Sequence, residues 1–328
     1  MKIKAGIIGG AGYTGGEMLR ILVNHPDVEI AFVNSTSNAG NLISDVHTDL
    51  IGDTDLKFVG DIPQDIDVLF LCVGHGDAQK FLTANPINDN IKIIDLSQDF
   101  RLIANRNSEI SNRKFVYGLP ELNRDAIKSA NNIANPGCFA TCIQLGLLPL
   151  AAKGLIKGEV HINATTGSTG AGQSLSTTSH FSWRNNNLSI YKAFEHQHLN
   201  EIGESLLQLQ PSLTDALSFI PQRGAFTRGI LAATYLESDL TLEEAQNRYE
   251  EYYRTHPFTH VNRKNIDLKQ VVNTNKALVH VEKHGNKLFI ISIIDNLLKG
   301  ASGQAVQNMN LMFGLEETAG LKLKAAYF

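Results

Sequence analysis

The glycine-rich segment close to the N-terminus constrains the fold of this chain more than any other feature. Residues 9–15 read G-G-A-G-Y-T-G, which contains the pattern G-x-G-x-x-G. An apolar run at residues 2–8 precedes it and a helix-like pattern at residues 17–23 follows it, which is the context that a dinucleotide site requires. Glycines in such a turn bring the backbone and the helix N-terminus close to a pyrophosphate. We therefore interpret the segment as a dinucleotide site rather than a glycine-rich turn without a ligand. The residues expected to contact the cofactor here are Gly10, Ala11, Gly12, Tyr13, Thr14 and Gly15.

Segments of strand and helix character alternate over the N-terminal part of the chain. Further strands are expected at residues 28–33, 68–73 and 91–96, and a second helix at residues 77–84. Short apolar runs followed by helices are typical of buried parallel strands. We therefore expect an α/β fold with a Rossmann-type, doubly wound parallel sheet.

The pattern changes near residue 135. An apolar helix is expected at residues 141–150, and Thr241 with Glu244 predicts a capping box for a helix at residues 240–253. A third helix is expected at residues 302–313. Runs rich in β-branched and apolar residues occur at residues 160–164, 216–220, 230–236, 277–283 and 288–294. These runs predict a second, α+β domain built on a large mixed sheet.

Composition excludes several classes of protein. The chain has 328 residues, of which 43% are hydrophobic and 19% charged, so it is long and apolar enough to bury a core. The net charge is −4 and the basic residues form no tract, so no nucleic-acid partner is expected. No apolar run approaches the roughly 18 residues that a membrane helix needs, and no targeting peptide is recognised. We expect a cytoplasmic protein.

The end of the second strand bears on the choice of dinucleotide. Residues 34–38 read N-S-T-S-N and contain no carboxylate, whereas an NAD site usually has Asp or Glu about 20 residues after the glycines. The hydroxyls of Ser35 and Ser37 are suited to donate to a 2′-phosphate, although the segment has no arginine. We expect NADP(H), with an ordinary polar turn as the alternative.

One of three cysteines is a candidate nucleophile. Cys138 follows Asn-Pro-Gly and precedes an apolar helical run, so it falls near a helix N-terminus. Such a position lowers a thiol pKa from about 8.5 and offers N–H groups to an oxyanion. The alternative, a small buried apolar side chain, is our interpretation of Cys72 and Cys142. No C-x-x-C pair occurs, and no metal site is expected.

Residues 195–201, E-H-Q-H-L-N-E, form the densest cluster of titratable side chains. A histidine close to Cys138 would serve as its acid or base. A metal site is disfavoured because no third ligand stands at a convincing spacing. A solvated polar face remains the third interpretation.

Motifs distributed over the whole chain point to one family. They are G-G-A-G-Y-T-G at Gly9, D-L-S-Q-D-F-R at Asp95, Y-G-L-P-E-L-N-R at Tyr117, N-P-G-C at Asn135, G-S-T-G-A-G at Gly167, H-Q-H-L-N-E-I at His196, R-G-I-L at Arg228 and D-N-L-L-K-G-A-S-G-Q-A-V-Q-N-M-N-L-M at Asp295. Together they resemble the N-acetyl-γ-glutamyl-phosphate reductases of arginine biosynthesis.

The resemblance implies a fold like that of the aspartate-semialdehyde and glyceraldehyde-phosphate dehydrogenases. It implies a dinucleotide-binding domain at residues 1–137, joined by a C-terminal helix at residues 300–328. Residues 138–299 would form the catalytic, substrate-binding and oligomerisation domain. A homodimer or homotetramer, with a small-molecule acyl phosphate as substrate, is expected.

The implied reaction is NADPH-dependent reduction of N-acetyl-γ-glutamyl phosphate to N-acetylglutamate 5-semialdehyde and phosphate, through a thioester on Cys138. The family match implies His196 or His198 as the acid/base, with His196 preferred, and Glu201 as an orienting group. The substrate-binding residues implied are Ser168, Gly170, Gly172 and Arg228. His75 and Asn296 resemble cofactor contacts.

Several positions depart from the family pattern. Phe139-Ala140 stands in place of Tyr-Pro, and Gln173 and Gln197 stand where arginines are usual. The segment before Arg228 has Ala225 in place of Pro and gains Arg223. Acetyl is the expected N-acyl group, and these changes of charge suggest as an alternative a larger dicarboxylic group such as succinyl, whose free carboxylate would meet Arg223 or Arg184.

Two alternatives remain for the function as a whole. One is an aspartate-semialdehyde dehydrogenase, which shares fold and chemistry but not the H-x-H-x-x-E-I segment. The other is a non-catalytic NADP-binding regulator on the same fold, since a fold by itself does not establish a reaction.

Overall fold

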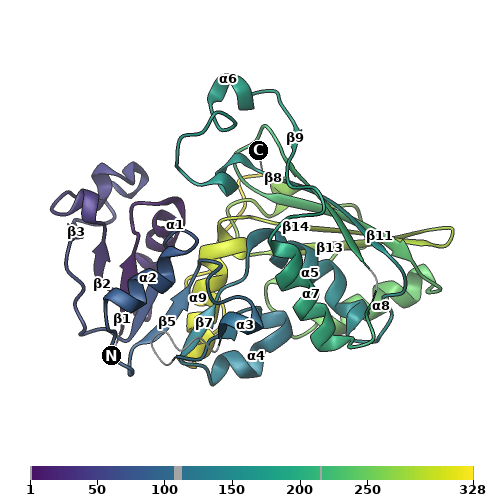
Figure 1. The fold of residues 1–328 in the computed structure, drawn as a ribbon, viewed down its shortest axis with the longest axis horizontal. Helices are drawn as coiled ribbons and strands as arrows, with labels where there is room; N and C mark the ends of the chain where they lie inside the picture. Colours follow the sequence, from purple (N-terminus) through teal and green to yellow (C-terminus); the bar gives the residue numbers. More distant parts are fainter. Residues whose placement is uncertain (1, 107–112, 215, 328) are drawn as a thin grey trace. The chain divides into compact units, whose positions relative to one another are not determined.

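The computed structural model describes residues 2–106, 113–214 and 216–327. The chain divides into two compact units (Figure 1). Unit 1 contains residues 1–136 and 301–322, and unit 2 contains residues 137–300 and 323–328.

The sheet of unit 1 has the strand order β3-β2-β1-β4-β5-β7-β6, and every described pair in it is parallel. Its strands are β1 (Ile3–Ile8), β2 (Val28–Asn34), β3 (Phe58–Val59), β4 (Val68–Leu71), β5 (Lys92–Asp95), β6 (Val116–Tyr117) and β7 (Asn132–Ala134). The chain runs outward from β1 through β2 to β3 and then returns to pair β4 with β1. The expected doubly wound sheet is confirmed, with its reversal of strand order beside β1.

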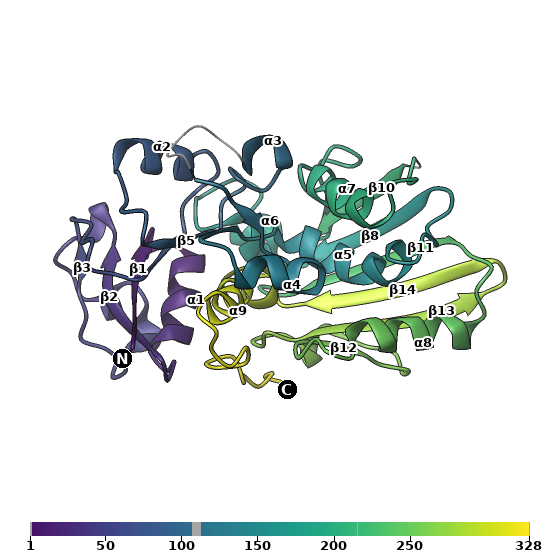
Figure 2. The same ribbon diagram turned by 90° about the horizontal axis from the view of Figure 1, so that it is seen from below.

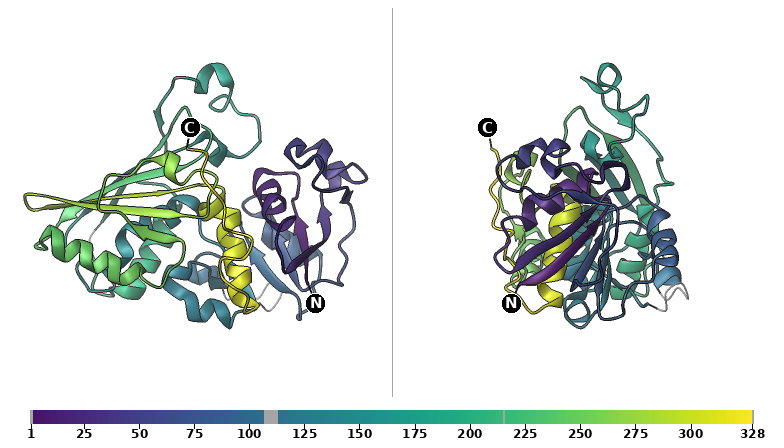
Figure 3. Two further views of the ribbon diagram at one scale, coloured as in Figure 1. Left: turned by 180° about the vertical axis from the view of Figure 1, so that it is seen from behind. Right: turned by 90° about the vertical axis from the view of Figure 1, so that its left-hand side faces the viewer.

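Helices cover the two faces of this sheet. They are α1 (Tyr13–Leu22), α2 (Asp77–Ala84), α3 (Ile103–Arg106), α4 (Pro120–Lys128) and α9 (Gly303–Met312), with short 3-10 helices η1 (Thr36–Asn38), η2 (Ile43–Asp45) and η3 (Thr48–Leu50). Ala78 and Leu82 of α2 pack into an apolar cluster with β1, β2, β4 and β5. On the other side, α9 packs against α1 and α4, although it comes from the far end of the sequence (Figure 3).

The C-terminal helix is shorter than the family resemblance suggested. The resemblance implied a helix from residue 300 to residue 328, but α9 ends at Met312, in agreement with the helix that the sequence pattern predicted at residues 302–313. Gly314 has a φ of +66°, which a helix cannot continue through. The Asn310 side chain then donates to the carbonyls of Glu317 and Ala319 and so holds the following segment in a non-helical path. A π-helical turn, η7 (Leu298–Ser302), precedes α9.

Unit 2 is built on a mixed sheet with the order β12-β13-β14-β11-β8-β10-β9. Pairs β8–β10 and β12–β13 are parallel and the other described pairs are antiparallel. Its strands are β8 (Val160–Thr166), β9 (Ser189–Ile190), β10 (Leu217–Arg223), β11 (Ile230–Glu237), β12 (Thr259–Val261), β13 (Ala277–His284) and β14 (Lys287–Ile294). The expected mixed sheet is confirmed. A two-residue turn joins β13 to β14, with Gly285 at a φ of +57° as such hairpins require.

Helices pack on one face of this sheet (Figure 2). They are α5 (Cys138–Ala151), α7 (His198–Leu209) and α8 (Leu242–Tyr253), while α6 (Phe181–Arg184), η5 (Ser168–Ala171) and η6 (Leu268–Gln270) lie in loops. The apolar helix α5 is almost entirely buried and contacts β8, β11, β13 and β14. Helix α8 has the predicted capping box, in which the Glu244 N–H donates to Thr241 Oγ1 and the Thr241 N–H donates to Glu244. Within the described ranges, each helix is too short or too polar to cross a membrane.

Candidate active site

Cys138 is the first residue of α5, as the sequence indicated. The N-cap, Gly137, has an extended backbone and no side chain that could cap the helix. Cys138 is partly exposed, whereas Cys72 and Cys142 are buried and burial raises the pKa of each of those thiols to about 12. The Cys142 thiol also donates to the Ser292 carbonyl at 3.2 Å. Cys138 therefore has the position of a nucleophile, and the interpretation of the other two as buried apolar side chains is confirmed.

Two glycines allow the backbone to approach closely around Cys138. A Cβ at Gly300 would lie 2.9 Å from the Cys138 Cβ. A Cβ at Gly137 would meet His198 Nε2 and lie 2.7 Å from Glu201 Oε1. The Gly137 N–H donates instead to Glu201 Oε2 at 3.1 Å. The turn before the nucleophile is thus bonded to α7.

His198 and Glu201 form a buried pair on the first turn of α7. His198 Nε2 lies 3.7 Å from Glu201 Oε1, and both side chains are almost fully buried. Their spacing of three residues puts them on the same helix face. The solvated-face interpretation of residues 195–201 is therefore wrong for this pair, because the apolar face of α7 carries them into the interior of unit 2.

His196 lies beside this pair in an aromatic surround. Its ring makes edge contacts with Phe139, Tyr191 and Phe219, with centroid distances of 5.5, 5.8 and 5.5 Å. Burial, followed by the positive charges of Lys192 and Arg223, lowers the pKa of His196 to about 4. The His198 N–H donates to His196 Nδ1 at 3.2 Å, so the proton of the neutral imidazole is on Nε2. His196 is therefore a neutral ring that donates from Nε2.

Arg228, which we expected to bind a substrate anion, forms an ion pair with a carboxylate of the same unit. Its Nε and Nη2 donate to the two carboxylate oxygens of Asp295 at 3.0 and 3.1 Å. Asp295 also accepts the backbone N–H groups of Asn273 and Leu297. The pair therefore fixes the start of β11 against the segment after β14.

Hydrogen bonds to neighbouring segments hold the glycine-containing loop after β8, and part of the loop is exposed. The Ser168 and Thr169 N–H groups donate to the carbonyls of Phe226 and Thr227. Asn296 bridges the same region, since its amide donates to Thr169 Oγ1 and its carbonyl accepts the Gly229 N–H. Among the predicted substrate contacts, Ser168 is partly exposed and Gly170 and Gly172 are exposed.

The glycine-rich turn of unit 1 fits a dinucleotide pyrophosphate. Gly9 has a φ of +77°, a Cβ at Gly10 would collide with Val33, and one at Gly15 would lie 2.7 Å from the Gly10 Cα. A Cβ at Gly12 would meet only ordinary van der Waals contact. Helix α1 has no side-chain cap and no acidic residue in its first turn. The packing thus brings strand and helix together and leaves the helix N-terminus available to an anion. The predicted contacts Ala11, Tyr13 and Thr14 lie in this same turn.

Residues at the end of β2 present hydroxyls and no carboxylate. The Asn38 amide donates to Ser35 Oγ and Ser37 Oγ, both at 3.1 Å, which leaves each hydroxyl proton available to an acceptor. Ser35 is buried and Ser37 is exposed. His75, a further predicted cofactor contact, is exposed and accepts the Gln98 N–H at 3.2 Å.

The D-L-S-Q-D-F-R segment acts as a scaffold. Asp99 accepts the Gly76 and Gln79 N–H groups at 2.6 and 3.0 Å and so caps α2 beside His75. Arg101 donates from Nε to the Asn135 carbonyl at 2.8 Å. This segment therefore supports the turn that leads to Cys138.

Sequence reasoning missed Tyr191 and Phe219 as parts of these arrangements, and nothing local marks them. Asp295 opens one of the family motifs, but its pairing with Arg228 was not predicted. Among the described residues, no group of three His, Cys, Asp or Glu side chains is placed to hold a metal ion.

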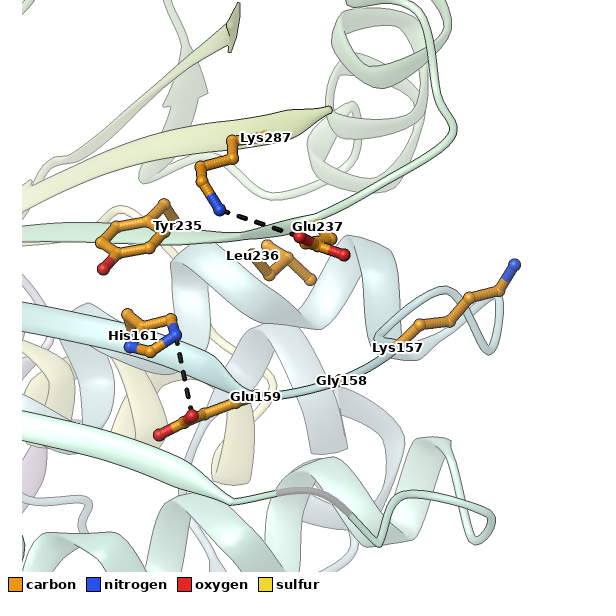
Figure 4. A pocket seen from close by; sticks show the side chains of 8 residues that line it. All are labelled: Lys157, Gly158, Glu159, His161, Tyr235, Leu236, Glu237 and Lys287. Carbon is orange, nitrogen blue, oxygen red and sulfur yellow. Dashed lines mark ion pairs between the residues drawn. The ribbon is translucent and has the colours of Figure 1, made fainter. Parts of the chain in front are cut away.

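A hollow of about 230 Å³ lies elsewhere in unit 2, at the opposite ends of β8 and β11 from the loop that carries Ser168 (Figure 4). The rings of His161 and Tyr235 stack there with their centroids 4.7 Å apart, and the Lys287 ammonium lies 5.6 Å from the centroid of the Tyr235 ring. Its charges are paired, His161 with Glu159 and Lys287 with Glu237. Figure 4 shows these side chains at the rim of the sheet, and none of the candidate catalytic residues is among them.

Comparison with known proteins defines the class. Residues 4–130 match the family model of the semialdehyde dehydrogenase NAD binding domain, and residues 138–296 match that of the semialdehyde dehydrogenase dimerisation domain. A crystal structure of aspartate semialdehyde dehydrogenase II complexed with ASA from Vibrio cholerae superposes with a TM-score of 0.72, at 16% identity, over 96% of this chain and 99% of that one. The NADP-containing enzyme from Candida albicans gives a TM-score of 0.66, at 14% identity, over 95% and 99%. The chain thus has the semialdehyde dehydrogenase fold.

Closer relatives narrow the class. The N-acetyl-gamma-glutamyl-phosphate reductase of Bacteroides thetaiotaomicron is 61% identical over 99% of this chain and 100% of the relative. That of Christiangramia forsetii is 58% identical over the same shares. The chain belongs to the N-acetyl-gamma-glutamyl-phosphate reductase family.

Proposed function

We propose that the chain reduces N-acetyl-γ-glutamyl phosphate to N-acetylglutamate 5-semialdehyde and phosphate, with NADPH, in arginine biosynthesis. The carrying observation is the partly exposed Cys138 at the uncapped start of α5, with the buried His198–Glu201 pair against the glycine before it. The names of the close relatives support the acetylated substrate.

The reaction starts with attack of the Cys138 thiolate on the acyl carbon. A C–S bond forms, the bond from carbon to the phosphate oxygen breaks, and phosphate leaves. The dipole of α5 and the N–H groups of its first turn, which no side chain caps, would stabilise negative charge on the sulfur and on the acyl oxygen.

The histidines divide the proton chemistry. His198 takes the thiol proton, and Glu201 at 3.7 Å stabilises the imidazolium that results. His196 stays neutral and its Nε2–H is a hydrogen-bond donor for the acyl oxygen. The sequence did not decide between the two histidines, although we preferred His196 as the acid/base, and the tautomer of His196 supports His198 in that role.

The cofactor belongs to unit 1. The residues from Gly10 to Gly15 would hold the pyrophosphate, and Ser35 and Ser37 would donate to a 2′-phosphate. The reduced nicotinamide would supply the hydride for the thioester carbon when it is bound. The C–S bond to Cys138 then breaks, which releases the aldehyde and returns the thiolate. We further propose that His75 and Asn296 contact the cofactor and that NADP(H) is preferred over NAD(H).

Substrate binding involves the loop after β8, through Ser168, Gly170 and Gly172. Arg228 donates from Nε and Nη2 to Asp295. It therefore contributes positive charge next to that loop and does not use these two N–H groups to bind a substrate anion. The pairing also supports Asn296, whose amide contacts both Thr169 and Gly229.

Among the described residues, one face of the sheet of unit 2 carries no α-helix, and the loop with η6 packs on part of that face against Leu231 and Phe289. Side chains of alternate residues on that face are partly exposed, among them His161, Leu231, Tyr235 and Phe289. Because the matching family model is that of a dimerisation domain, we propose that two copies of the chain associate through this face.

The reaction is tested by NADPH formation from the semialdehyde, phosphate and NADP⁺. The wild type is expected to be active and Cys138→Ser inactive, with cofactor binding retained in both. Iodoacetamide is expected to label one thiol in the folded wild type, because Cys72 and Cys142 are buried.

The same experiment separates the alternatives. Activity on aspartate semialdehyde in place of the N-acylated substrate would establish the first alternative. Cofactor binding with no turnover, unaffected by Cys138→Ser, would establish the regulator.

A further inference from the structure

We propose that Arg223 selects substrates whose N-acyl group itself ends in a carboxylate, such as N-succinyl-γ-glutamyl phosphate. The inference rests on the proposed reductase reaction and keeps its chemistry, but it assigns succinyl in place of acetyl as the preferred acyl group. The succinyl group differs from acetyl by a carboxymethyl extension, so its recognition needs a cation at a fixed distance from the amide.

Arg223 is placed by the sheet. It is the last residue of β10 and pairs with Thr166 of β8 on one side and Ser189 of β9 on the other. Its guanidinium carbon lies 4.7 Å from the centroid of the Tyr191 ring, over the ring face. A planar cation stacked on an aromatic ring has little rotational freedom and keeps its edge N–H groups for a ligand.

This stacked pair adjoins the candidate catalytic residues. The ring centroids of Tyr191 and His196 lie 5.8 Å apart in an edge contact. Burial raises the pKa of Tyr191, and negative charge on Cys138 adds to this effect. Burial lowers the pKa of His196, and the charges of Lys192 and Arg223 add to this effect. The guanidinium is therefore in the surroundings of the nucleophile and not on a distant surface.

The positive charge has no local compensation. Arg184 is buried beside Arg223 and donates to the Arg223 carbonyl at 2.7 Å, to Ser189 Oγ and to the Thr178 carbonyl. Within the described part of the chain, neither arginine forms an ion pair, and the buried Nε of Arg223 has no hydrogen-bond partner. Burial, followed by repulsion from Arg223, lowers the pKa of Arg184. A ligand anion bound to Arg223 would offset the electrostatic repulsion between these two adjacent arginines.

The anion is assigned to the acyl group because the rest of the substrate is shared by the whole family. Every N-acyl-γ-glutamyl phosphate carries an α-carboxylate and a phosphate, and Arg228 of the family motif is retained. Relative to the family motifs that this sequence resembles, Arg223 stands as an added cation, and Gln173 and Gln197 stand at positions where those motifs usually have arginine. Arg228 is retained while the charges around it differ. This combination fits a substrate whose phosphate and α-carboxylate are unchanged and whose N-acyl group differs.

The test compares kcat/KM for N-succinyl- and N-acetylglutamate 5-semialdehyde, with phosphate and NADP⁺, in the intact protein. The wild type is expected to have a kcat/KM at least tenfold higher for the succinyl substrate, because roughly one charge-assisted hydrogen bond contributes a factor of that size. Arg223→Gln is expected to lose about 10- to 100-fold on the succinyl substrate and less than about threefold on the acetyl one. Arg223→Lys is expected to regain part of the preference, and the exposed Arg254→Gln to leave both values unchanged.

Other outcomes overturn the proposal in distinguishable ways. A wild type that prefers the acetyl substrate overturns it without need of a variant. An equal loss on both substrates in Arg223→Gln would show that the arginine binds a shared group. Absence of turnover with either substrate contradicts the reductase reaction itself, and labelling of Cys138 then shows whether the nucleophile is intact.

Discussion

The backbone N–H of His198 donates to the Nδ1 atom of His196 at 3.2 Å. This bond uses the acceptor of the His196 ring and leaves its proton on Nε2. Two neighbouring histidines thereby take different roles, since His198 has a carboxylate beside its Nε2 and His196 has an aromatic surround. The sequence H-Q-H does not contain this distinction, because it arises from the backbone turn at the start of α7.

The two histidines are expected to respond differently to substitution by glutamine. The side-chain amide of glutamine places an N–H donor near the position of Nε2 but takes up no proton. His196→Gln is therefore expected to keep kcat within roughly tenfold of wild type, whereas His198→Gln loses about 10²- to 10⁴-fold, the usual contribution of a general base. Steady-state rates of both variants with saturating cofactor provide the measurement. A larger loss for His196→Gln than for His198→Gln would reverse the assignment.

Stability in acid is expected to depend on His196. Its pKa is about 4 in the folded protein and near 6.5 in an unfolded chain, chiefly because of burial. Between these two values the unfolded state binds one proton more than the folded state. The free energy of unfolding therefore falls as the pH drops from about 6.5 towards 4, by up to roughly 1.4 kcal/mol per pH unit from this group.

Urea unfolding at several pH values measures this effect. His196→Gln is expected to flatten the pH dependence in that window, and the exposed His180→Gln serves as a matched control. An unchanged slope in His196→Gln would mean that the ring is protonated in the folded state.

Features that depend on neighbours in the sequence were predictable. The capping box of Thr241 and Glu244 needs only residues three apart, and both bonds are present. Cys138 was expected near a helix start because Pro and Gly precede it, and α5 begins there. The glycine turn before α1 was predictable for the same reason, since its steric demands involve the adjoining strand and helix.

Features that depend on distant partners were not predictable. Strand β10 was expected to end at residue 220, before Pro221, but pairing with β8 and β9 extends it to Arg223. Arg228 was expected to bind a ligand anion, yet it donates to Asp295, 67 residues away. The end of β10 and the partner of Arg228 both depend on residues that are far away in the sequence. A local sequence pattern cannot predict such contacts.

Two glycines near α7 offer a matched pair of substitutions. A Cβ at Gly137 would meet His198 and Glu201, whereas one at Gly203 has nothing within 4 Å. Gly137→Ala is expected to displace the buried pair and lower kcat at least tenfold. Gly203→Ala lies within a helix and is expected to raise stability by about 0.5–1 kcal/mol with unchanged kcat. Thermal unfolding and initial rates on both variants test this, and normal activity of Gly137→Ala would show that the position of the pair is not critical.

The end of β2 provides a test of cofactor choice. Ser37 is exposed and its oxygen accepts from the Asn38 amide, so an aspartate there puts negative charge at the expected 2′-phosphate position. Ser37→Asp is expected to lower kcat/KM for NADP⁺ by roughly tenfold or more, because like charges repel, and to leave NAD⁺ unaffected or improved. Ser37→Asn, which matches the shape without the charge, is expected to stay within about threefold of wild type for both cofactors. Equal losses for NADP⁺ in the two variants would instead indicate that the hydroxyl, and not the local charge, carries the preference.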